Sequence, residues 1–300
     1  MVEVAAIVVN FRRAAATLRT VTELRAAGFA DLDVLVVENG SGDDSAAQLR
    51  AGLGGRAELQ VLDHNAGYCG AVNRGLTWAR GKGASYVLLL NNDVRLPNGF
   101  LEPLVATLRN DPGVAAVAPT TLRPDGRVWA QGGSVRALAN LVRLNAHGCV
   151  PHPVTHGPEA VEFVPGACAL YRRSDLDATG GLDESYFMYW EDVVLGARLR
   201  AAGRKVVWLP WVRVVHEAGG SSGGPRSPLR KYLCALNSVR WVRAHGRLRH
   251  WLALLGFDLL LWPLALAGGV RGGVAKLAGL VDGLRGRRAD ARAVARWLDG

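Results

Sequence analysis

The first ninety residues alternate short apolar runs with stretches of helical periodicity, and this alternation constrains the fold more than any other feature. The apolar runs are rich in Val and Leu, as expected of strands buried on both faces, and span residues 4–9, 34–37, 59–62 and 86–90. Between them, apolar side chains recur at helical spacing in residues 13–27, 44–53 and 69–80. The pattern predicts a βαβαβαβ unit, which is an α/β fold with parallel strands and right-handed crossovers.

Polar residues follow each of these runs: Asn10, Glu38 with Asn39, His64 with Asn65, and residues 91–93. Ligands of open parallel sheets bind beyond the carboxyl ends of the strands. We therefore expect one crevice to collect these groups.

The composition changes after a Gly-, Ser- and Pro-rich stretch at residues 219–228, where the chain becomes helical, basic and Leu-rich. A chain of 300 residues is long enough for one large α/β domain with an appendage. We predict a catalytic domain over residues 1–225 and a helical segment over residues 226–300.

The net basic charge is confined to this C-terminal segment. Residues 226–300 hold 14 Lys and Arg against 4 Asp, and the difference of +10 equals the net charge of the whole chain. Such a placement favours contact with an anionic surface. The basic residues alternate with Leu, Val and Ala rather than with stacking aromatic side chains, which argues against a nucleic-acid partner.

Residues 251–270 are almost wholly apolar, and three interpretations stay open. A membrane-spanning helix needs about 20 apolar residues, but Asp258 interrupts this stretch. Interfacial helices at a membrane surface fit the Lys and Arg residues within 247–288. A helical cap on the catalytic domain or a homodimer contact is the third interpretation.

The cysteines are scattered without CxxC spacing, and no charged secretory leader precedes the first apolar run. A reducing cytoplasm fits these features best. The membrane surface we expect is accordingly the inner face of the plasma membrane.

Asp93 closes the sequence Leu89-Leu90-Asn91-Asn92-Asp93, in which a carboxylate follows a buried strand. A hard divalent cation held by one or two carboxylates can neutralise a departing diphosphate. Asp93 is therefore our candidate metal ligand. The alternative is an ordinary turn, because Asn and Asp are common turn residues.

A second acidic site, Glu191-Asp192, ends an aromatic patch and begins an amphipathic helix. Aromatic surface can bind the apolar faces of a sugar, and a nearby carboxylate can remove the proton of an acceptor hydroxyl. Asp192 is our candidate general base, with Glu191 beside it. Alternatively, both acids only favour the helix N-terminus electrostatically, by about 0.3–1 kcal/mol.

Two weaker signals accompany these acids. His216 closes a strand-like run and could ligate the metal or contact a diphosphate, although a lone His at a strand end is often incidental. The stretch from Asn65 to Gly75, which includes Gly67 and Asn73, leads into a helix whose N–H groups could meet a phosphate or ribose. Glycine could instead allow close packing of that helix on the sheet.

Taken in this order, these segments resemble the family 2 glycosyltransferases, especially their bacterial rhamnosyltransferase-like branch, over roughly residues 4–245. The resemblance implies a GT-A fold, in which helices flank a mostly parallel, Rossmann-like sheet. It also implies that Glu38 contacts the nucleobase, that Asn91-Asn92-Asp93 is the metal motif and that Asp192 is the base. The remaining donor-binding candidates are Asn10, Arg12, Asn65, Gly67 and Asn73.

Two positions depart from the family pattern. Glu38 stands where Asp is usual, and its longer side chain could alter the preference for a base. Asn91 replaces the first acid of the metal motif, which makes Asp93 the main charged ligand and leaves open whether metal is dispensable.

The resemblance implies an inverting transferase that moves a sugar from a nucleoside-diphosphate donor to an acceptor hydroxyl, assisted by Mn²⁺ or Mg²⁺. A dTDP-activated L-rhamnose or related deoxyhexose is the leading donor, and UDP-sugars come next. The acceptor is a saccharide, a lipid-linked compound or a small molecule, and the expected role is cell-wall or polysaccharide biosynthesis.

Two rival functions stay open. A sugar-1-phosphate nucleotidyltransferase should carry a Gly-rich loop with Arg and Lys after the first strand, and Asn10-Phe11-Arg12-Arg13 lacks those glycines. A catalytically silent, membrane-docked module that binds nucleotide sugars is consistent with the altered metal motif.

Overall fold

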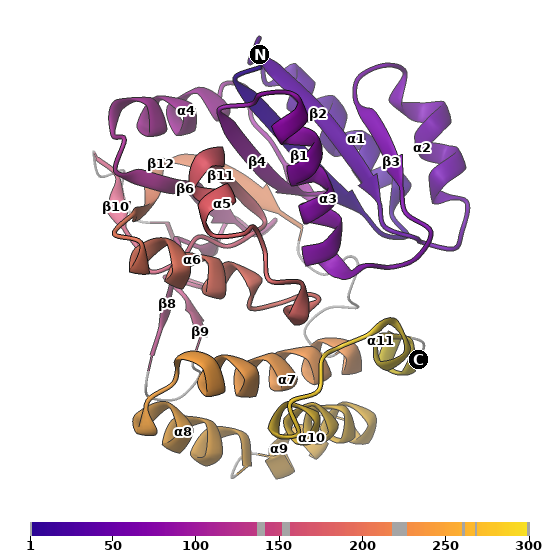
Figure 1. Cartoon of the computed structure of the whole chain (residues 1–300), viewed down its shortest axis with the longest axis vertical. Helices are drawn as coiled ribbons and strands as arrows, with labels where there is room; N and C mark the ends of the chain where they lie inside the picture. Colours follow the sequence, from indigo (N-terminus) through magenta and orange to yellow (C-terminus); the bar gives the residue numbers. More distant parts are fainter. Residues whose placement is uncertain are drawn as a thin grey trace.

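The computed structural model of the chain describes residues 2–136, 142–151, 157–217, 227–259, 262–267 and 269–298. In these residues a sheet of ten strands is covered by helices, and the C-terminal helices form a further layer at the lower end of the molecule (Figure 1). The predicted α/β architecture with a helical C-terminal appendage is confirmed.

The predicted βαβαβαβ unit is present, with small shifts at its boundaries. In chain order it comprises β1 (Val4–Asn10), α1 (Ala14–Ala26), β2 (Leu32–Glu38), α2 (Ser45–Leu53), β3 (Glu58–Val61), α3 (Gly67–Gly81) and β4 (Tyr86–Asn91). The strands are parallel in the order β4-β1-β2-β3. At their carboxyl ends Asn10 is paired with Glu38, and Val9 with Asn91. The polar residues that follow the strands therefore lie along the same edge of the sheet, at the carboxyl ends of the strands.

The irregular middle of the chain completes the sheet in the order β10-β12-β6-β11-β4. β11 runs antiparallel to β4 and β6, whereas β12 runs parallel to β6, so this half of the sheet is mixed. Its long strands are β6 (Val114–Leu122), β11 (Cys168–Arg172) and β12 (Lys205–His216), and its short ones are β5 (Val94–Arg95), β7 (Val128–Ala130) and β10 (Glu159–Ala160). β8 (Gly133–Val135) and β9 (Val142–Leu144) form a separate antiparallel pair. β5 pairs with the end of β12, where His216 lies opposite Val94 and is thereby brought beside Asp93.

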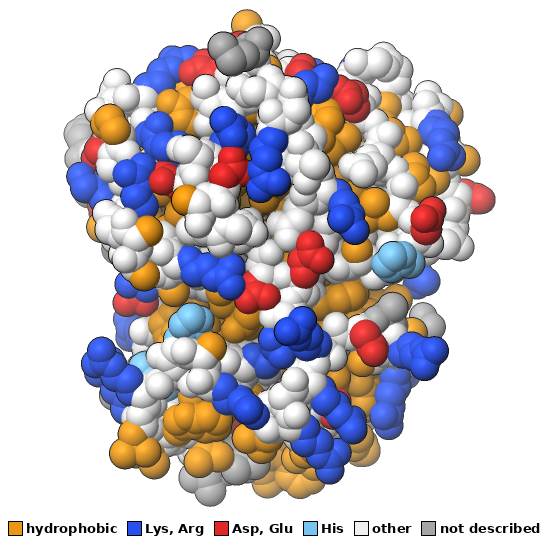
Figure 2. All heavy atoms as spheres, viewed as in Figure 1, with side chains coloured by type: hydrophobic (Ala, Val, Ile, Leu, Met, Phe, Trp, Pro, Cys, Tyr) orange, Lys and Arg blue, Asp and Glu red, His pale blue; other side chains and the backbone are white. Residues whose placement is uncertain are grey.

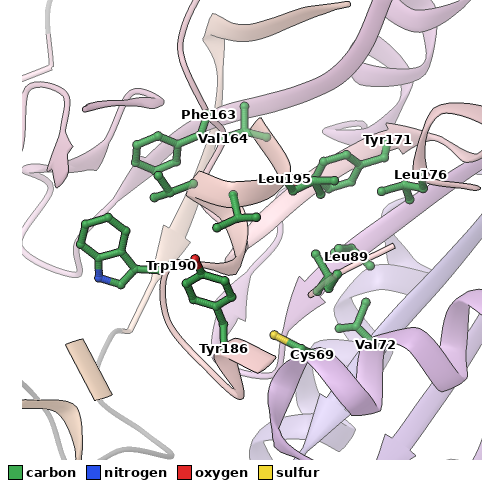
Figure 3. Packing of buried hydrophobic residues seen from close by; sticks show 14 of the residues in the cluster. Cys69, Val72, Leu89, Phe163, Val164, Tyr171, Leu176, Tyr186, Trp190 and Leu195 are labelled. Carbon is green, nitrogen blue, oxygen red and sulfur yellow. The ribbon is translucent and has the colours of Figure 1, made fainter. Parts of the chain in front are cut away.

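Helices cover both faces of the sheet. Alternate residues of its strands point to opposite sides, and apolar side chains on each side pack against helices. On β1, Val4 and Val8 belong to one core and Ile7 to the other. The first core includes residues of α1, α2 and α4 (Leu101–Asn110), and the second includes residues of α3, α5 (Arg173–Ala178) and α6 (Glu191–Ala201). Figure 3 shows part of the second core, including Val72, Leu89, Tyr171, Leu176 and Leu195. With both faces buried, the carboxyl edge of the sheet is left for ligands.

The C-terminal segment folds into α7 (Pro228–His245), α8 (Leu248–Leu254), α9 (Trp262–Ala267), α10 (Val270–Leu284) and α11 (Ala291–Leu298), with a π-helical turn over Leu255–Leu259. Of these helices, α7, α10 and α11 share a core that contains Tyr232 and Leu233, and Phe187 from the aromatic patch before α6 inserts into it. The aromatic patch therefore joins the C-terminal helices to the rest of the molecule. The predicted domain boundary between residues 225 and 226 lies outside the described residues.

Among the described helices, none has both the length and the apolar character needed to cross a membrane. Residues 251–270 are one apolar run in the sequence, and those of them that the structure describes lie mostly in the end of α8, the π-helical turn, α9 and the start of α10. Asp258 in the π-helical turn forms an ion pair with Lys276 of α10 at 2.6 Å. The charge that interrupts the apolar run therefore has a partner within the helical layer.

Candidate active site

A cavity of about 1330 Å³ opens where the carboxyl edge of the sheet meets the loop before α6 and the C-terminal helices. Asp93 and His216 line it from the sheet, and Glu191 and Asp192 line it from the start of α6. The acid after the fourth strand and the later acid pair therefore border a common space.

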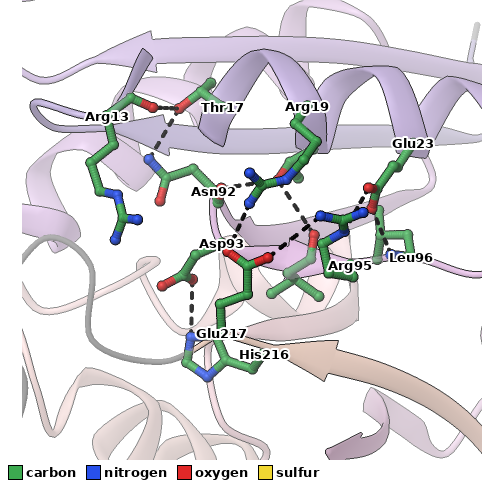
Figure 4. Close-up of polar contacts among 12 residues, drawn as sticks. Arg13, Thr17, Arg19, Glu23, Asn92, Asp93, Arg95, Leu96, His216 and Glu217 are labelled. Carbon is green, nitrogen blue, oxygen red and sulfur yellow. Dashed lines mark hydrogen bonds and ion pairs between the residues drawn. The ribbon is translucent and has the colours of Figure 1, made fainter. Parts of the chain in front are cut away.

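Asp93 and His216 form a close pair on the sheet side of the cavity (Figure 4). Nε2 of His216 lies 3.0 Å from Oδ1 of Asp93, and the two residues are only 7% and 6% exposed. Burial opposes ionisation of Asp93, but the hydrogen bond and charge of His216, together with the charge of Arg13, lower the pKa of Asp93 below its usual value. Asp93 is therefore a carboxylate at neutral pH. The ring of Trp129 packs edge-on against His216 with 4.5 Å between centroids, which restrains the imidazole.

This pair has the donor atoms and the spacing of a site for a small divalent cation. Adjacent ligands of an octahedral cation with bonds of about 2.1 Å lie about 3 Å apart, and Oδ1 of Asp93 and Nε2 of His216 are 3.0 Å apart. Nδ1 of His216 is buried without a hydrogen-bond partner among the described residues. Those residues contain no group of three or more His, Cys or acidic side chains that could hold a metal ion, so substrate oxygens would complete the coordination, as they commonly do for Mg²⁺. The residues present fit a cation shared with a diphosphate.

Asn91 and Asn92 line the cavity next to Asp93, but their contacts differ. Asn92 ties the end of β4 to α1, because its Nδ2 donates to Oγ1 of Thr17 at 3.0 Å and its carbonyl accepts from Oγ1 of Thr20 at 2.9 Å. The side chain of Asn91 is partly exposed at the cavity wall. Asn91 is thus the better placed of the two to contact a ligand.

Glu191 and Asp192 are the first two residues of α6. Oδ1 of Asp192 accepts from the N–H of Val193 at 2.8 Å, whereas Oε2 of Glu191 is buried without a hydrogen-bond partner among the described residues. Removal from bulk water raises the pKa of Asp192 to about 6 and that of Glu191 to about 8, and repulsion from Asp192 contributes to the second shift. Both shifts favour keeping a proton on the acid pair at a higher pH than two free carboxyl groups would. A carboxylate whose pKa lies close to neutrality is suited to accept a hydroxyl proton.

The acid pair follows an aromatic turn whose backbone is strained. Phe187, Tyr189 and Trp190 have positive φ angles of 60°, 68° and 73°, which are unfavourable for residues with a Cβ. Asn237, a buried residue of α7, holds this turn by donating from Nδ2 at 2.9, 2.9 and 3.0 Å to the carbonyl oxygens of Tyr186, Met188 and Tyr189. A C-terminal helix thus fixes the backbone that presents the acid pair.

The loop that leads into α3 packs against the same turn. Asn39, Asn65 and Gly67 line the cavity, and Nδ2 of Asn39 donates to Oδ1 of Asn65 at 3.1 Å. Gly67 has a φ of +75°, and a Cβ there would lie 2.6 Å from the carbonyl oxygen of Phe187. Gly67 thus packs closely against the aromatic turn rather than against the sheet, and its position in the cavity wall also leaves it available to a ligand.

Glu38, Asn10 and Arg12 lie outside the cavity lining, as does His64. The carboxylate of Glu38 accepts from the N–H groups of Gly40 and Ser41 at 3.2 and 3.0 Å and from the Ser41 hydroxyl. Oγ of Ser41 also accepts from the N–H of Arg12 at 2.8 Å, and Oδ1 of Asn10 accepts from Oγ1 of Thr17 at 2.7 Å. These side chains hold loops together, and their contact with a nucleotide stays a prediction.

Asn73 is also absent from the cavity wall. Its Nδ2 donates at 2.9 Å both to the carbonyl of Leu182 and to Oε1 of Glu184, and its Oδ1 accepts from the N–H of Leu182 at 3.0 Å. Asn73 therefore connects α3 to the loop before the aromatic turn. Its predicted contact with the donor is likewise untested.

Sequence reasoning missed much of the cavity wall. The strands β7 to β9 and their loops contribute Arg123, Trp129, Arg136, Arg143 and His147. The C-terminal helices contribute Arg230, Lys231, Cys234, Phe257 and Lys276. No spacing pattern marks these residues, because they come from short strands or from one side of separate helices. The basic, Leu-rich composition of the C-terminal segment is the one signal that points to some of them.

A model of the family described as glycosyl transferase family 2 matches residues 5–180. The chain is 31% identical over 218 residues to N-acetylglucosaminyl-diphospho-decaprenol L-rhamnosyltransferase of Mycobacterium tuberculosis, with 64% of this chain and 68% of that protein covered. Its fold is similar to that of mannosyltransferase PcManGT from Pyrobaculum calidifontis in complex with GDP-Man and Mn²⁺, with a TM-score of 0.56 and 18% identity over 98% of this chain and 78% of the other. It is also similar to GalNAc-T7 with UDP, GalNAc and Mn²⁺, with a TM-score of 0.60 and 14% identity over 96% of this chain and 55% of the other. The predicted GT-A fold is thereby confirmed.

Proposed function

This chain belongs to glycosyl transferase family 2, and from that premise we propose that it moves a sugar from a nucleoside-diphosphate donor to an acceptor hydroxyl with inversion at the anomeric carbon. The family makes it a nucleotide-sugar glycosyltransferase. The observation that carries the proposal is that one cavity is bordered both by the Asp93–His216 pair and by Asp192, whose pKa is raised to about 6. The Asp93–His216 pair is suited to hold a cation beside the diphosphate leaving group, and Asp192 is suited to accept the proton of the acceptor hydroxyl.

The proposed reaction is a single displacement. Asp192 takes the proton of the acceptor hydroxyl while that oxygen attacks C1 of the donor sugar from the face opposite the nucleotide. The bond from C1 to the diphosphate breaks, and its electron pair leaves with the nucleoside diphosphate. The raised pKa of Glu191 favours a proton on the acid pair and so limits the negative charge in this corner of the cavity. The strained turn held by Asn237 keeps the base in place.

Asp93 and His216 are the residues that we assign to a divalent cation, either Mn²⁺ or Mg²⁺. When bound, the cation neutralises the charge that develops on the diphosphate. Asn91 adds a neutral amide to this side of the cavity rather than a second carboxylate. We expect modest cation affinity without a nucleotide, because Asp93 supplies the only negative charge of the pair.

The donor we propose is an activated deoxyhexose such as dTDP-L-rhamnose, with UDP-sugars as the next choice. This choice comes from the Mycobacterium relative, which is named as an L-rhamnosyltransferase of N-acetylglucosaminyl-diphospho-decaprenol. By analogy we propose a lipid-linked saccharide as the acceptor and a role in cell-wall or polysaccharide biosynthesis.

Release of nucleoside diphosphate from a panel of nucleotide sugars, with Mn²⁺, Mg²⁺ or EDTA and with or without acceptors, tests the proposal. We expect dTDP-L-rhamnose to be used fastest and EDTA to suppress turnover. Asp192→Asn should lower the rate about 10²–10⁴-fold without lowering the melting temperature. Asp33→Asn is the matched control, because Asp33 is a partly exposed residue near the start of β2 that pairs with Lys82. For any acceptor that is used, the anomeric configuration of the product reports inversion or retention.

Each rival has its own signature in the same assays. A chain that binds nucleotide sugars but releases no diphosphate with any acceptor would be the silent binding module. Formation of a nucleotide sugar from a nucleoside triphosphate and a sugar 1-phosphate would identify a nucleotidyltransferase. Full activity of Asp192→Asn would remove Asp192 from the mechanism.

We also propose that the C-terminal helices rest on the inner face of the plasma membrane. Among the described residues, seven of the nine exposed large apolar side chains belong to α8, the π-helical turn and α10: Leu248, Leu252, Leu255, Val270, Val274, Leu277 and Leu284. Within each group they recur every three, four or seven residues and so share one helix face. Figure 2 shows apolar side chains gathered at this end of the molecule with Lys and Arg side chains around them. An apolar helix face bordered by cations is typical of helices that lie in an anionic membrane interface.

Co-sedimentation with phosphatidylcholine vesicles, with and without phosphatidylglycerol, tests this contact. Binding should require the anionic lipid and fall about tenfold or more when Leu248 and Leu252 are both changed to Ser. Val61→Ser is the control, because Val61 is an exposed apolar residue of β3. A homodimer that light scattering detects, and that the double substitution abolishes, would assign this face to a second copy of the chain instead.

A further inference from the structure

We propose that the part of the cavity walled by the C-terminal helices binds the phosphate or diphosphate group of a lipid-linked acceptor. Arg230, Lys231 and Lys276 supply the cations, and Leu254 and Phe257 receive the first segment of the lipid. This assignment rests on the proposed function, because it concerns the acceptor side of the same cavity.

One face of α7 forms the wall nearest the acid pair. Its cavity-lining residues recur at helical spacing and are Leu229, Arg230, Lys231, Cys234, Ala235 and Ser238. The guanidinium carbon of Arg230 lies 5.8 Å from the ring centre of Tyr189, which is two residues before Glu191. An anion bound at Arg230 therefore lies beside the turn that presents Asp192.

α7 and α10 bring two lysines together in this wall. Lys231 reaches across Gly272 of α10, where a Cβ would lie 2.6 Å from the Lys231 ammonium nitrogen. Lys276 is one helical turn beyond Gly272 on α10, and both lysines line the cavity. Gly272 thus provides the room that places the Lys231 ammonium near Lys276.

The charges in this wall do not cancel. Lys276 pairs with Asp258 at 2.6 Å, and Asp258 is the one carboxylate that the C-terminal helices contribute to the lining, as far as the structure describes them. Arg230 and Lys231 form no ion pair with any described carboxylate. The wall therefore keeps a net positive charge, whereas the carboxylates of Asp93, Glu191 and Asp192 line the walls formed by the sheet and by the start of α6. An anionic acceptor is attracted to the helical end and repelled from the carboxylates.

The rest of this wall is apolar, which favours an amphiphile over a free phosphate. Leu229, Leu254, Phe257, Val294 and Leu298 line it, and a small hydrophilic anion would gain nothing from such surface. The same helices turn apolar side chains outward as well. α8 places Leu254 in the cavity and Leu252 in solvent, and α10 places Lys276 in the cavity and Leu277 in solvent. A lipid held in a membrane against α8 and α10 can therefore extend its charged head into the cavity.

Binding of four probes to the full chain tests the assignment: farnesyl diphosphate, farnesyl phosphate, farnesol and inorganic pyrophosphate. Calorimetry in EDTA excludes cation-mediated binding at Asp93 and His216. We expect one or both farnesyl phosphates to bind about tenfold or more tightly than farnesol and pyrophosphate, because charge-assisted hydrogen bonds add to apolar contact. The tighter of the two phosphate probes distinguishes a diphosphate from a monophosphate head.

Three substitutions identify the residues. Lys231→Gln should weaken binding of the better farnesyl phosphate about tenfold. Asp258→Asn should strengthen it, because Lys276 is released from its ion pair. Lys205→Gln is the matched control, since Lys205 is exposed on β12 and pairs with Asp111 at 2.9 Å. Two substitutions with opposite expected effects guard against a loss that merely reflects misfolding.

The contrary outcomes are distinct. Farnesol that binds as tightly as its phosphates overturns the anion site, and pyrophosphate that binds as tightly as farnesyl diphosphate overturns the lipid. Unchanged affinity in both Lys231→Gln and Asp258→Asn overturns the assignment of residues. Donor hydrolysis by the parent chain, measured without acceptor, separates this proposal from the proposed function: hydrolysis without farnesyl phosphate binding refutes the subsite alone.

Discussion

Gly67 packs so closely against Phe187 that a Cβ on Gly67 would lie 2.6 Å from the Phe187 carbonyl oxygen and 2.8 Å from its ring. The N–H of Cys69 donates to the same carbonyl at 3.2 Å. These contacts join the start of α3 to the turn that presents Glu191 and Asp192. Two motifs that are far apart in the sequence therefore depend on each other for their geometry.

Gly67→Ala should lower the free energy of unfolding by about 2–4 kcal/mol, because the new Cβ must displace the turn and the backbone must keep a positive φ. Gly55→Ala is the matched control, since Gly55 has a φ of +76° but open space around it. It should cost only about 1 kcal/mol. Urea unfolding measures both changes. Equal losses would mean that backbone strain alone, and not the contact with Phe187, requires glycine at position 67.

Asn237→Asp should disrupt the turn, because a carboxylate would replace the amide that donates to the carbonyls of Tyr186, Met188 and Tyr189. We expect a loss of about 3 kcal/mol in unfolding free energy and a fall in kcat with little change in the KM of the donor. The split between kcat and KM identifies a positioning role, which a general loss of folded protein would not produce. Asn110→Asp, at the exposed end of α4, is the control. A rise in donor KM with unchanged kcat would contradict this role.

The first half of the fold was predictable because each of its elements is recorded in local periodicity. The strands β1, β2 and β4 are built around buried apolar runs, and the helices between the strands carry apolar residues at helical spacing. β3 is different: its sequence predicts burial on both faces, but it is an edge strand with alternating polar residues and is partly exposed. The position of Asp93 at the carboxyl edge follows from the same pattern. The closeness of His216 to Asp93 does not, because it depends on the pairing of β5 with β12.

The direction of a side chain beyond a strand end was the part that the sequence left undetermined. Glu38 follows a strand in the way that a ligand-binding residue would, yet its carboxylate turns back onto the N–H groups of Gly40 and Ser41. Asn237 has no local signal at all, since its partners lie about fifty residues earlier in the chain. Such long-range hydrogen bonds follow from the packing of α7, which no spacing rule describes.

Glu191→Gln should make the free energy of unfolding less dependent on pH than it is in the parent chain. The variant should gain stability relative to the parent at pH 8 but not at pH 5. The folded state raises the pKa of Glu191 to about 8 from an ordinary value of 4.5. Because the folded state binds this proton more tightly than the unfolded state, stability is highest below the unfolded pKa and is lost as pH rises towards the folded pKa. A neutral amide escapes this loss, and a rise in pKa from 4.5 to about 8 corresponds to a difference of about 3–4 kcal/mol between pH 5 and pH 8. Thermal unfolding across this pH range measures the difference in stability. Glu58→Gln is the contrasting control, because Lys82 lowers the pKa of Glu58.

Asp93→Asn should weaken the effect of divalent cations on nucleotide binding. Mn²⁺ should raise the affinity of the parent chain for dTDP or UDP, because a cation held by Asp93 would offset the negative charge of the diphosphate. The variant lacks the charge of Asp93. We therefore expect the gain in nucleotide affinity that Mn²⁺ causes in the variant to be less than about a tenth of the gain in the parent chain. Calorimetric titrations with Mn²⁺ and with EDTA provide the comparison. A variant that responds to Mn²⁺ as fully as the parent would exclude Asp93 as a ligand.

The rate of transfer should depend on pH through both members of the acid pair. The acid limb should lie at a pH of about 6, because Asp192 must be ionised to accept a proton and its pKa is raised to about 6. An alkaline limb should appear at a pH of about 8, where Glu191 ionises and its charge repels the diphosphate of the donor. Glu191→Gln should remove the alkaline limb and leave the acid limb in place, because Glu191 is already neutral while Asp192 titrates. The profile of kcat/KM against pH for the parent and for Glu191→Gln decides the matter. An alkaline limb that persists in the variant would mean that another group titrates at about pH 8. Loss of the acid limb in the variant would mean that Glu191, rather than Asp192, is the base.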